Sequence, residues 1–274
     1  MVLGTLSGVL GLAVGSFLNV VVHRVPAGLS VVAPASACPV CGHAIRRRDN
    51  VPVLSWVLLR ARCRDCGTGI SARYPIVEAL TGVAFVLVVL RFAPAIAGAG
   101  AGSRESIAAV LVLIAFVSLM AVSVALAAID LDTSRLPNAI TYPSAVVLAV
   151  LLGGAAVVGG DGGALLRAVV GAVVLGGAYL ALALAVPGGM GLGDVKLAVV
   201  LGFALAYLGW GPLTVGAFAA FLLGGTFAVG LLVVRRGARR IGIPFGPWML
   251  AGAWLGVFFG EPLWQAYLGL LGLA

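Results

Sequence analysis

The sequence predicts an all-α polytopic membrane protein with about eight transmembrane helices and one small domain outside the lipid. Of its 274 residues, 62% are hydrophobic and only 9% are charged, whereas a soluble domain has roughly 25% charged residues. A soluble core of this length has no room for so much apolar surface, so lipid must solvate part of it. The forty glycines fit closely packed transmembrane helices, although a nucleotide bias of the source genome would enrich Gly, Ala and Val as well.

The predicted helices are apolar runs of roughly 18–25 residues, long enough to cross a hydrocarbon layer of about 30 Å. The first run has no basic N-terminal region and no clear cleavage site, which favours an uncleaved span over a signal peptide. We divide the chain into a first transmembrane helix (1–22), a polar four-cysteine domain (23–75) and a seven-helix membrane region (76–274). The runs lie at 3–22, 76–94, 107–129, 139–158, 164–186, 195–212, 214–234 and 246–272, and the turn signal Gly211-Pro212 separates two of them.

The basic residues indicate how the chain is oriented. In the eight-span pattern, all seventeen Lys and Arg except Arg91, Arg104 and Arg167 fall on the side that holds residues 23–75. Cytoplasmic loops carry the excess of Lys and Arg in membrane proteins, so the four-cysteine domain is predicted to be cytoplasmic and both termini outside. This asymmetry also accounts for the net charge of +8, and no nucleic-acid partner is expected.

Two of the nine acidic residues, Asp130 and Asp194, lie where apolar runs meet predicted cytoplasmic loops. Asp130 ends the run LMAVSVALAAID, and Asp194 begins the run DVKLAVVLGFALA. A carboxylate at the edge of the hydrocarbon is unfavourable unless water, a partner or a shared proton relieves it, and it is by default a functional hypothesis. Two carboxyls at similar depth that converge would share one proton. Such a pair offers a base to activate water and an acid to protonate a leaving amine.

Helix capping is the structural alternative for both aspartates. It accounts for Asp194 at a helix start, but not for Asp130 at a helix end, whose dipole a carboxylate opposes. The residues alone therefore leave catalysis and an ion or proton pathway both open. The stretch PGGMGLGD permits an extended peptide to approach Asp194 closely, although a flexible loop has the same composition. Lys196 either attracts a carboxylate, holds Asp194 ionised or extends from the helix end towards the interface.

The polar segment contains all four cysteines, as two CxxC pairs separated by twenty-one residues: Cys38 with Cys41, and Cys63 with Cys66. Four thiolates at this spacing are the ligand set of a structural, tetrahedral zinc site. Gly42 and Gly67 follow the second cysteine of each pair and fit tight turns. Two disulfides are the main alternative, which the predicted reducing cytoplasm disfavours, and the paired spacing disfavours free thiols. His43 is a further ligand type, but four cysteines already close the site.

These motifs together resemble the type IV prepilin peptidases, bacterial membrane aspartyl proteases of the GxGD type. GMGLGDVKL (189–197) resembles the second aspartate motif of the family, with Asp194 as the catalytic residue. IDLDTSRLPNAIT resembles the first, in which the catalytic Asp lies seven residues before Pro137, hence Asp130 and not Asp132. Three further stretches resemble features of the family. GLAVGSFLNVVVHRVP resembles its N-terminal signature, and IPFGPWMLAGAW resembles its last-helix motif. CPVCGHAI with DNVPVLSWVLLRARCRDCGTGISARYPIVE resembles its cytoplasmic cysteine domain. The segment RRRDN is more basic than the resemblance leads us to expect.

The resemblance implies a membrane aspartyl endopeptidase of the bacterial inner membrane. It would cut the leader of type IV prepilins or pseudopilins after a glycine at the cytoplasmic face, then N-methylate the new N-terminus with S-adenosylmethionine. That cofactor follows from the resemblance alone, because no Gly-rich nucleotide-binding loop between a strand and a helix is present. The expected partners are prepilins and the lipid bilayer. The expected active-site loop residues are Gly191, Gly193, Lys196, Pro137 and Asn138.

Three other functions remain as alternatives. A prepilin peptidase without methyl transfer is the first. A proton-coupled transporter that uses Asp130 and Asp194 is the second, and it would be expected to show internal repeats and charges near the bilayer midplane. Here the acids lie at one edge, and no repeat is evident in the sequence. An assembly scaffold without activity is the third.

Overall fold

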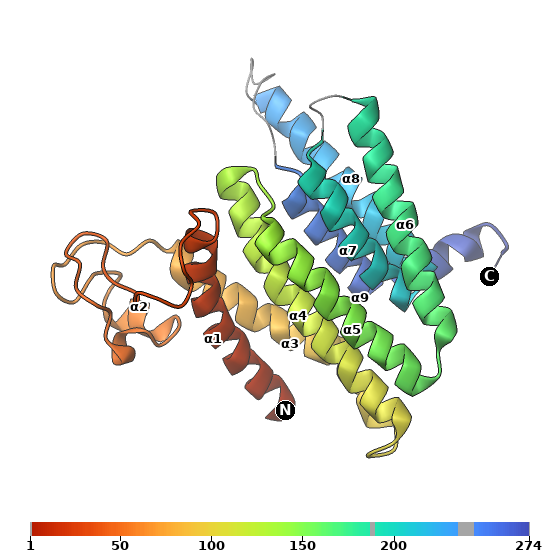
Figure 1. Cartoon of the computed structure of the whole chain (residues 1–274), viewed down its shortest axis with the longest axis horizontal. Helices are drawn as coiled ribbons and strands as arrows, with labels where there is room; N and C mark the ends of the chain where they lie inside the picture. Colours follow the sequence, from red (N-terminus) through yellow and green to blue (C-terminus); the bar gives the residue numbers. More distant parts are fainter. Residues whose placement is uncertain (1, 187–189, 235–243, 274) are drawn as a thin grey trace. The chain divides into compact units, whose positions relative to one another are not determined.

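A computed structural model describes residues 2–186, 190–234 and 244–273 of the chain (Figure 1). Within these ranges the backbone forms nine α-helices and one 3₁₀ helix, with two isolated β-bridges and no strand. The start of the predicted Gly-rich stretch, Pro187 to Gly189, lies outside the described residues. The predicted basic loop with Arg235, Arg236, Arg239 and Arg240 lies outside them too.

Eight of the helices in the described part of the chain are long, and they follow the eight predicted apolar runs in order. Six of them, α1, α3, α4, α5, α6 and residues Trp210–Leu231 of α8, are long and apolar enough to cross a membrane. The structure therefore confirms an all-helical, multi-pass membrane fold, although α7 and α9 do not meet both conditions. The long helices are α1 (Val2–Arg24), α3 (Arg73–Gly98), α4 (Arg104–Thr133), α5 (Asn138–Gly159), α6 (Gly162–Ala185), α7 (Leu192–Leu208), α8 (Trp210–Val234) and α9 (Gly246–Leu270).

The predicted break between the sixth and seventh runs was misplaced. The sequence indicated Gly211-Pro212, but α7 ends at Leu208 and α8 begins at Trp210, with Gly209 between them at φ +156°. Pro212 therefore lies in the first turn of α8. A proline fits there because its missing N–H would have no partner within the helix. The proline marks the start of a helix and not the end of one.

The chain divides into two compact units, and α4 contributes to both. The first unit comprises Met1–Gly98 and Phe116–Ala125, and the second comprises Ala99–Ala115 and Leu126–Ala274. These two units are defined by contacts between residues and not by function. The predicted functional division at residues 22 and 75 stays a prediction.

In the first unit, α1 packs along α3. Gly15 makes this approach close, because a Cβ there would lie 2.7 Å from the Cα of Glu78. Phe92 of α3 stacks on Phe116 of α4, with ring centroids 4.7 Å apart. The unit also carries the polar segment between α1 and α3, with η1 (Arg47–Asp49) and α2 (Leu54–Leu58).

In the second unit, α6 to α9 lie side by side (Figure 1). Glycines set the distance between neighbours. A Cβ at Gly202 of α7 would lie 2.5 Å from the carbonyl oxygen of Gly171 on α6, and one at Gly252 of α9 would lie 2.6 Å from that of Gly216 on α8. The predicted packing of small residues against neighbouring backbones is thus confirmed at these contacts.

Candidate functional site

Asp130 lies close to the end of α4, with only 4% of its surface exposed. The helix ends because Ser134 adopts a left-handed conformation (φ +50°), and its N–H bonds to the carbonyl oxygen of Asp130. The side chain of Asp130 turns to a different helix: its Oδ2 accepts a hydrogen bond of 3.0 Å from the backbone N–H of Gly246. Gly246 is the first residue of α9. The positive end of the α9 dipole therefore meets the carboxylate that the dipole of α4 disfavours.

Gly246 is a site residue that the sequence did not single out. A Cβ at this position would lie 2.6 Å from Asp130 Oδ2 and 3.3 Å from the side chain of Leu136. Only glycine leaves room for the carboxylate beside the first turn of α9. The Gly-Pro pair at the start of an apolar helix was the available signal, but nothing local connected it to Asp130.

Asp194 is the third residue of α7, and Gly191 is the N-cap residue. Its Oδ2 accepts a hydrogen bond of 3.1 Å from the backbone N–H of Gly191. The expected capping role is thus present. The cap uses Oδ2, and Oδ1 has no hydrogen-bond partner among the residues that the structure describes. The Asp194 carboxyl is half-buried and lies within electrostatic range of the Asp130 carboxyl.

Leu136, in the connection between α4 and α5, lies next to a glycine beside each aspartate, Gly193 before Asp194 and Gly246 at Asp130. A Cβ at Gly193 would lie 3.1 Å from the Cβ of Leu136, so this glycine admits the leucine beside the turn that carries Asp194. The same leucine packs near Gly246. Pro137 and Asn138 follow directly, as the N-cap and the first residue of α5.

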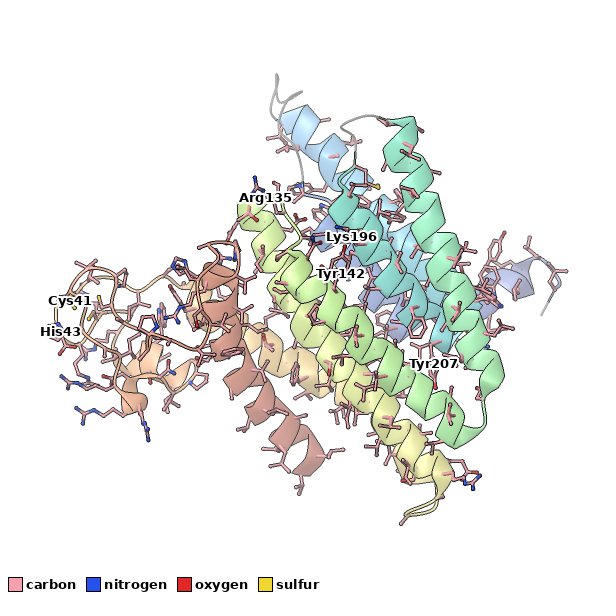
Figure 2. All side chains as sticks on the ribbon, viewed as in Figure 1. Cys41, His43, Arg135, Tyr142, Lys196 and Tyr207 are labelled. Atoms are coloured by element: carbon pink, nitrogen blue, oxygen red, sulfur yellow. The ribbon has the colours of Figure 1, made fainter. Side chains whose placement is uncertain are left out.

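Lys196 is directed towards α5. Its Nζ donates a hydrogen bond of 3.0 Å to Oδ1 of Asn138 and lies 5.3 Å from the ring centroid of Tyr142 (Figure 2). The described residues include no ion pair between Lys196 and Asp194. Lys196 and Asn138 therefore link the helix of Asp194 to the helix that follows Asp130.

Two further residues bear on the site. Asp132, the competitor of Asp130 in the sequence, is exposed, whereas Asp130 is buried. Tyr179 of α6 was not predicted; it is 2% exposed and lies within electrostatic range of Asp194. Its ring packs against Phe221 and Phe245, at centroid distances of 5.4 and 6.3 Å. Phe245, the residue directly before Gly246, therefore packs against aromatic side chains of the second unit.

The four cysteines form one cluster in the first unit. Their sulfur atoms all lie within 4.8 Å of one another, and no disulfide joins them. The Sγ atoms of Cys38 and Cys66 are 3.8 Å apart. Tetrahedral zinc with Zn–S bonds of about 2.3 Å requires S–S distances of about 3.8 Å. The arrangement fits a tetrahedral metal ion.

The two CxxC pairs have the same backbone structure. In each, the N–H of the glycine after the second cysteine bonds to the carbonyl of the first, at 2.9 Å. Gly42 and Gly67 have the same positive φ of 72°, which confirms the predicted tight turns. Each pair is also flanked by an isolated bridge with the same offset, 37 to 44 and 62 to 69. Two equal half-sites facing each other are typical of four-cysteine zinc sites.

Ion pairs brace the second CxxC pair. Arg64 forms a two-bond contact with Asp49, at 2.6 and 2.8 Å, and Arg46 pairs with Asp65 at 2.9 Å. The hydrogen bond from Arg64 lowers the pKa of Asp49. Backbone N–H groups of Cys41 and Val40 lower the pKa of the Cys38 thiol to about 6, whereas desolvation and the neighbouring thiols raise the pKa of Cys41. In the absence of a metal ion, a thiolate is thus favoured at Cys38 and disfavoured at Cys41.

Comparison with known proteins places these features in one family. The model of the Bacterial Peptidase A24 N-terminal domain matches residues 9–92, which contain the cysteine cluster. The model of the Type IV leader peptidase family matches residues 114–229, which contain both aspartates. No solved structure matches the chain.

Three relatives, each named prepilin leader peptidase/N-methyltransferase, match nearly end to end. The protein from Aeromonas salmonicida strain A449 is 35% identical, over 95% of this chain and 92% of the relative. The protein from Burkholderia pseudomallei strain 1026b is 37% identical, over 93% and 85%. The protein from Pseudomonas putida is 36% identical, over 98% and 94%. The chain belongs to the type IV leader peptidase family, together with the prepilin leader peptidase/N-methyltransferases.

Proposed function

We propose that this protein is a membrane aspartyl endopeptidase that cuts the leader from type IV prepilins or pseudopilins, after a glycine and at the cytoplasmic membrane face. It then N-methylates the new N-terminus. One observation carries the proposal: Asp130 and Asp194 come from different helices, lie within electrostatic range of each other, and each accept one backbone N–H at the start of a helix. The relatives are named prepilin leader peptidase/N-methyltransferase, so their names combine the two proposed activities in one protein.

The paired carboxyls suit peptide hydrolysis. Two close carboxylates share a proton, so one acts as a base and the other as an acid. The base takes a proton from water, and the resulting nucleophile attacks the carbonyl carbon of the glycine. The acid then protonates the leaving amine of the next residue. The N-terminal ends of α7 and α9 hold the two carboxyls in place and offset their mutual repulsion.

The residues around the dyad take supporting roles in this proposal. Gly191 and Gly193 keep the turn before Asp194 compact, so that an extended substrate backbone can reach it. Pro137 and Asn138 begin α5, and the hydrogen bond from Lys196 to Asn138 fixes that helix to α7. Asp130 is the catalytic partner rather than Asp132, because Asp130 is buried beside Gly246 while Asp132 is exposed.

The cysteine cluster would hold a structural zinc ion through Cys38, Cys41, Cys63 and Cys66. All four ligands would come from protein, so the ion would have no open position for substrate. Zinc would stabilise a segment that has little apolar core of its own. We place this segment in the cytoplasm and both termini outside, since the Lys and Arg residues gather on its side.

S-adenosylmethionine would supply the methyl group in the second activity. The comparisons give the transporter alternative no support. A peptidase without methyl transfer remains the alternative that an experiment must separate, because the paired aspartates account for cleavage alone.

The test uses the purified full-length protein in liposomes with a prepilin whose leader is basic and ends in glycine. Mass spectrometry should show a cut directly after that glycine, and a prepilin with Gly→Val at that position should stay intact. Labelled S-adenosylmethionine should then transfer one methyl group to the new N-terminus. Intact glycine prepilin would overturn the peptidase proposal, and a cut without methylation would favour the peptidase-only alternative.

A further inference from the structure

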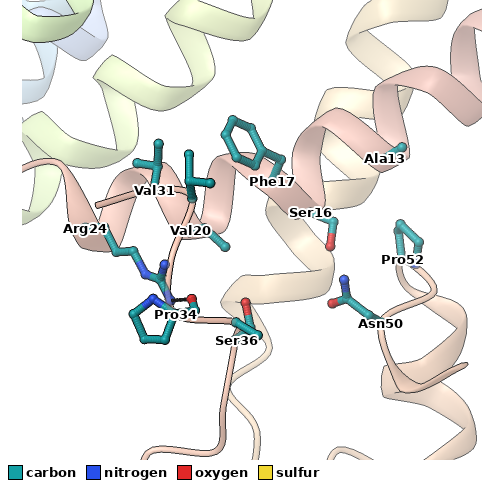
Figure 3. A pocket seen from close by; sticks show the side chains of 12 residues that line it. Ala13, Ser16, Phe17, Val20, Arg24, Val31, Pro34, Ser36, Asn50 and Pro52 are labelled. Carbon is teal, nitrogen blue, oxygen red and sulfur yellow. Dashed lines mark hydrogen bonds between the residues drawn. The ribbon is translucent and has the colours of Figure 1, made fainter. Parts of the chain in front are cut away.

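Peptide hydrolysis is faster when a hydrogen-bond donor meets the carbonyl oxygen, on which negative charge develops as water attacks. A cavity of about 350 Å³ lies in the first unit, between α1 and the residues around 31–36 and 50–52 (Figure 3). All of its lining residues belong to that unit, whereas both aspartates belong to the second. A donor next to the aspartates therefore has to come from the second unit itself.

Several donors around the aspartates already have acceptors. The backbone N–H groups of Gly246 and Gly191 bond to the two carboxyls. The ammonium group of Lys196 donates to Asn138 on α5. The phenol of Tyr179 on α6 is different, because it lies near the aspartates and has no such partner.

The packing of α6 on α7 places Tyr179 beside the start of α7, where Asp194 lies. The two helices run antiparallel, and a Cβ at Gly176 would lie 2.5 Å from Cγ2 of Val199. Tyr179 follows Gly176 by about 4.5 Å along the axis of α6, and Asp194 precedes Val199 by about 7.5 Å along α7. The two residues are thus offset by roughly 3 Å along the helices, less than one turn. They also lie within electrostatic range of each other.

The hydroxyl of Tyr179 reaches open space, although the ring is enclosed. Only 2% of the surface of Tyr179 is exposed. Every fully enclosed side-chain oxygen or nitrogen in the described part of the chain has a hydrogen-bond partner, and this hydroxyl has none, so its oxygen is accessible. Oδ1 of Asp194 has no partner either, so the hydroxyl and the carboxyl do not bond each other directly. A polar group held in this way is satisfied only when a bound molecule supplies an acceptor.

Aromatic neighbours fix the ring of Tyr179. Its centroid lies 5.4 Å from that of Phe221 on α8 and 6.3 Å from that of Phe245, and the rings of Phe221 and Phe245 are 5.4 Å apart. Aromatic rings at such distances attract each other beyond the effect of burial alone. Phe245 directly precedes Gly246, whose N–H holds Asp130. The ring is therefore fixed to the same helix start that holds one carboxyl, while α7 carries the other.

We propose that Tyr179 is a catalytic residue whose hydroxyl donates a hydrogen bond to the carbonyl oxygen of the glycine at which prepilin is cut. The proposal rests on the proposed peptidase function. A peptide bond that enters between this hydroxyl and Asp194 gives the hydroxyl its missing acceptor and presents the carbonyl carbon to water at the carboxyls. Because the ring is fixed before the substrate binds, the donor needs no reorganisation when charge develops.

The tyrosine keeps its proton throughout the reaction. Water gives a proton to one carboxyl as its oxygen attacks the carbonyl carbon, and the π electron pair of the carbonyl moves onto the oxygen that Tyr179 holds. The pair then returns to the carbon–oxygen bond as the carbon–nitrogen bond breaks. The leaving nitrogen takes a proton from the other carboxyl.

Tyr179→Phe tests the proposal, because it removes the hydroxyl and keeps the ring. The hydroxyl has no partner to lose within the described chain, so the melting temperature should match that of wild type. The purified full-length protein in liposomes, with a glycine prepilin, yields kcat and KM. We expect kcat to fall roughly 100- to 1,000-fold. KM should stay within about threefold, because the hydrogen bond strengthens mainly in the transition state.

Tyr207→Phe is the matched control. Tyr207 is the last residue but one of α7, about 20 Å along the helix from Asp194. Figure 2 shows Tyr207 and Lys196 at opposite ends of this helix. The same loss of a hydroxyl at this position should leave kcat and KM at their wild-type values.

The pH profile of kcat separates a donor to the substrate from a residue that acts only through the ionisation of Asp194. A donor lowers kcat alike at every pH, so the profile of Tyr179→Phe should keep the wild-type shape. A fall in kcat of less than about tenfold, a loss that a change of pH recovers, or a raised KM with unchanged kcat would each overturn the proposal. Cleavage at equal rates by wild type and Tyr179→Phe refutes the role of Tyr179 alone, whereas a wild type that leaves prepilin intact refutes the proposed function.

Discussion

Replacing Gly246 by alanine tests whether the contact between α9 and Asp130 matters for cleavage. The added Cβ would lie 2.6 Å from Asp130 Oδ2, so the carboxyl must move and lose its 3.0 Å hydrogen bond from the Gly246 N–H. A hydrogen bond to a charged group contributes about 1.5–3 kcal/mol. Because roughly 1.4 kcal/mol corresponds to a tenfold change in rate, Gly246→Ala should lower kcat/KM for prepilin about 10- to 100-fold.

Gly162→Ala is the matched control. Gly162 is the first residue of α6, as Gly246 is of α9, but an added Cβ there meets no atom within 4 Å. Cleavage of a prepilin in liposomes is followed by gel shift at substrate concentrations below KM. Gly162→Ala should match the wild type. A folded Gly246→Ala variant that also cuts at the wild-type rate would refute the role assigned to this contact.

Three further predictions concern the cysteine cluster and Lys196. Cys63→Ser should lower the zinc content and the melting temperature of the purified protein, and unchanged zinc by metal analysis would contradict the four-cysteine site. The hydrogen bond from Arg64 lowers the pKa of Asp49, so the pair stabilises the fold above the ordinary Asp pKa of about 3.9 and is lost as pH falls through the lowered value. Asp49→Asn should therefore lower the melting temperature near pH 7. The decrease should be larger than that for Asp65→Asn, because Asp65 is more exposed than Asp49. The difference in melting temperature between Asp49→Asn and wild type should shrink below about pH 4. Lys196→Met should retain cleavage within roughly tenfold, because Lys196 bonds to α5; complete loss would instead assign the lysine to the chemistry.

Features set by neighbouring residues could be predicted from the sequence. Hydropathy located the helices, because each span must satisfy its own backbone in lipid. The CxxC spacing located the cysteine cluster, because a short turn brings the two thiols of a pair close together. The turns at Gly42 and Gly67 then followed from the need for positive φ.

Contacts between distant segments could not be predicted in this way. Gly246 follows Asp130 by more than a hundred residues, and no periodicity relates the two. Leu136 was unremarkable in sequence, yet it packs near both Gly193 and Gly246. Val53 has φ 61°, against the local preference of valine, and its N–H bonds to Glu78, which lies on another helix.

The most direct test of the paired-aspartate mechanism compares prepilin cleavage by Asp130→Asn, Asp194→Asn and Asp132→Asn in the same liposomes. Asparagine preserves size and removes the ionisable group. We predict no detectable cut by Asp130→Asn or Asp194→Asn, and most of the wild-type rate for Asp132→Asn. Substantial cleavage by either of the first two variants, with Asp132→Asn inactive, would show that Asp130 and Asp194 are not the catalytic pair.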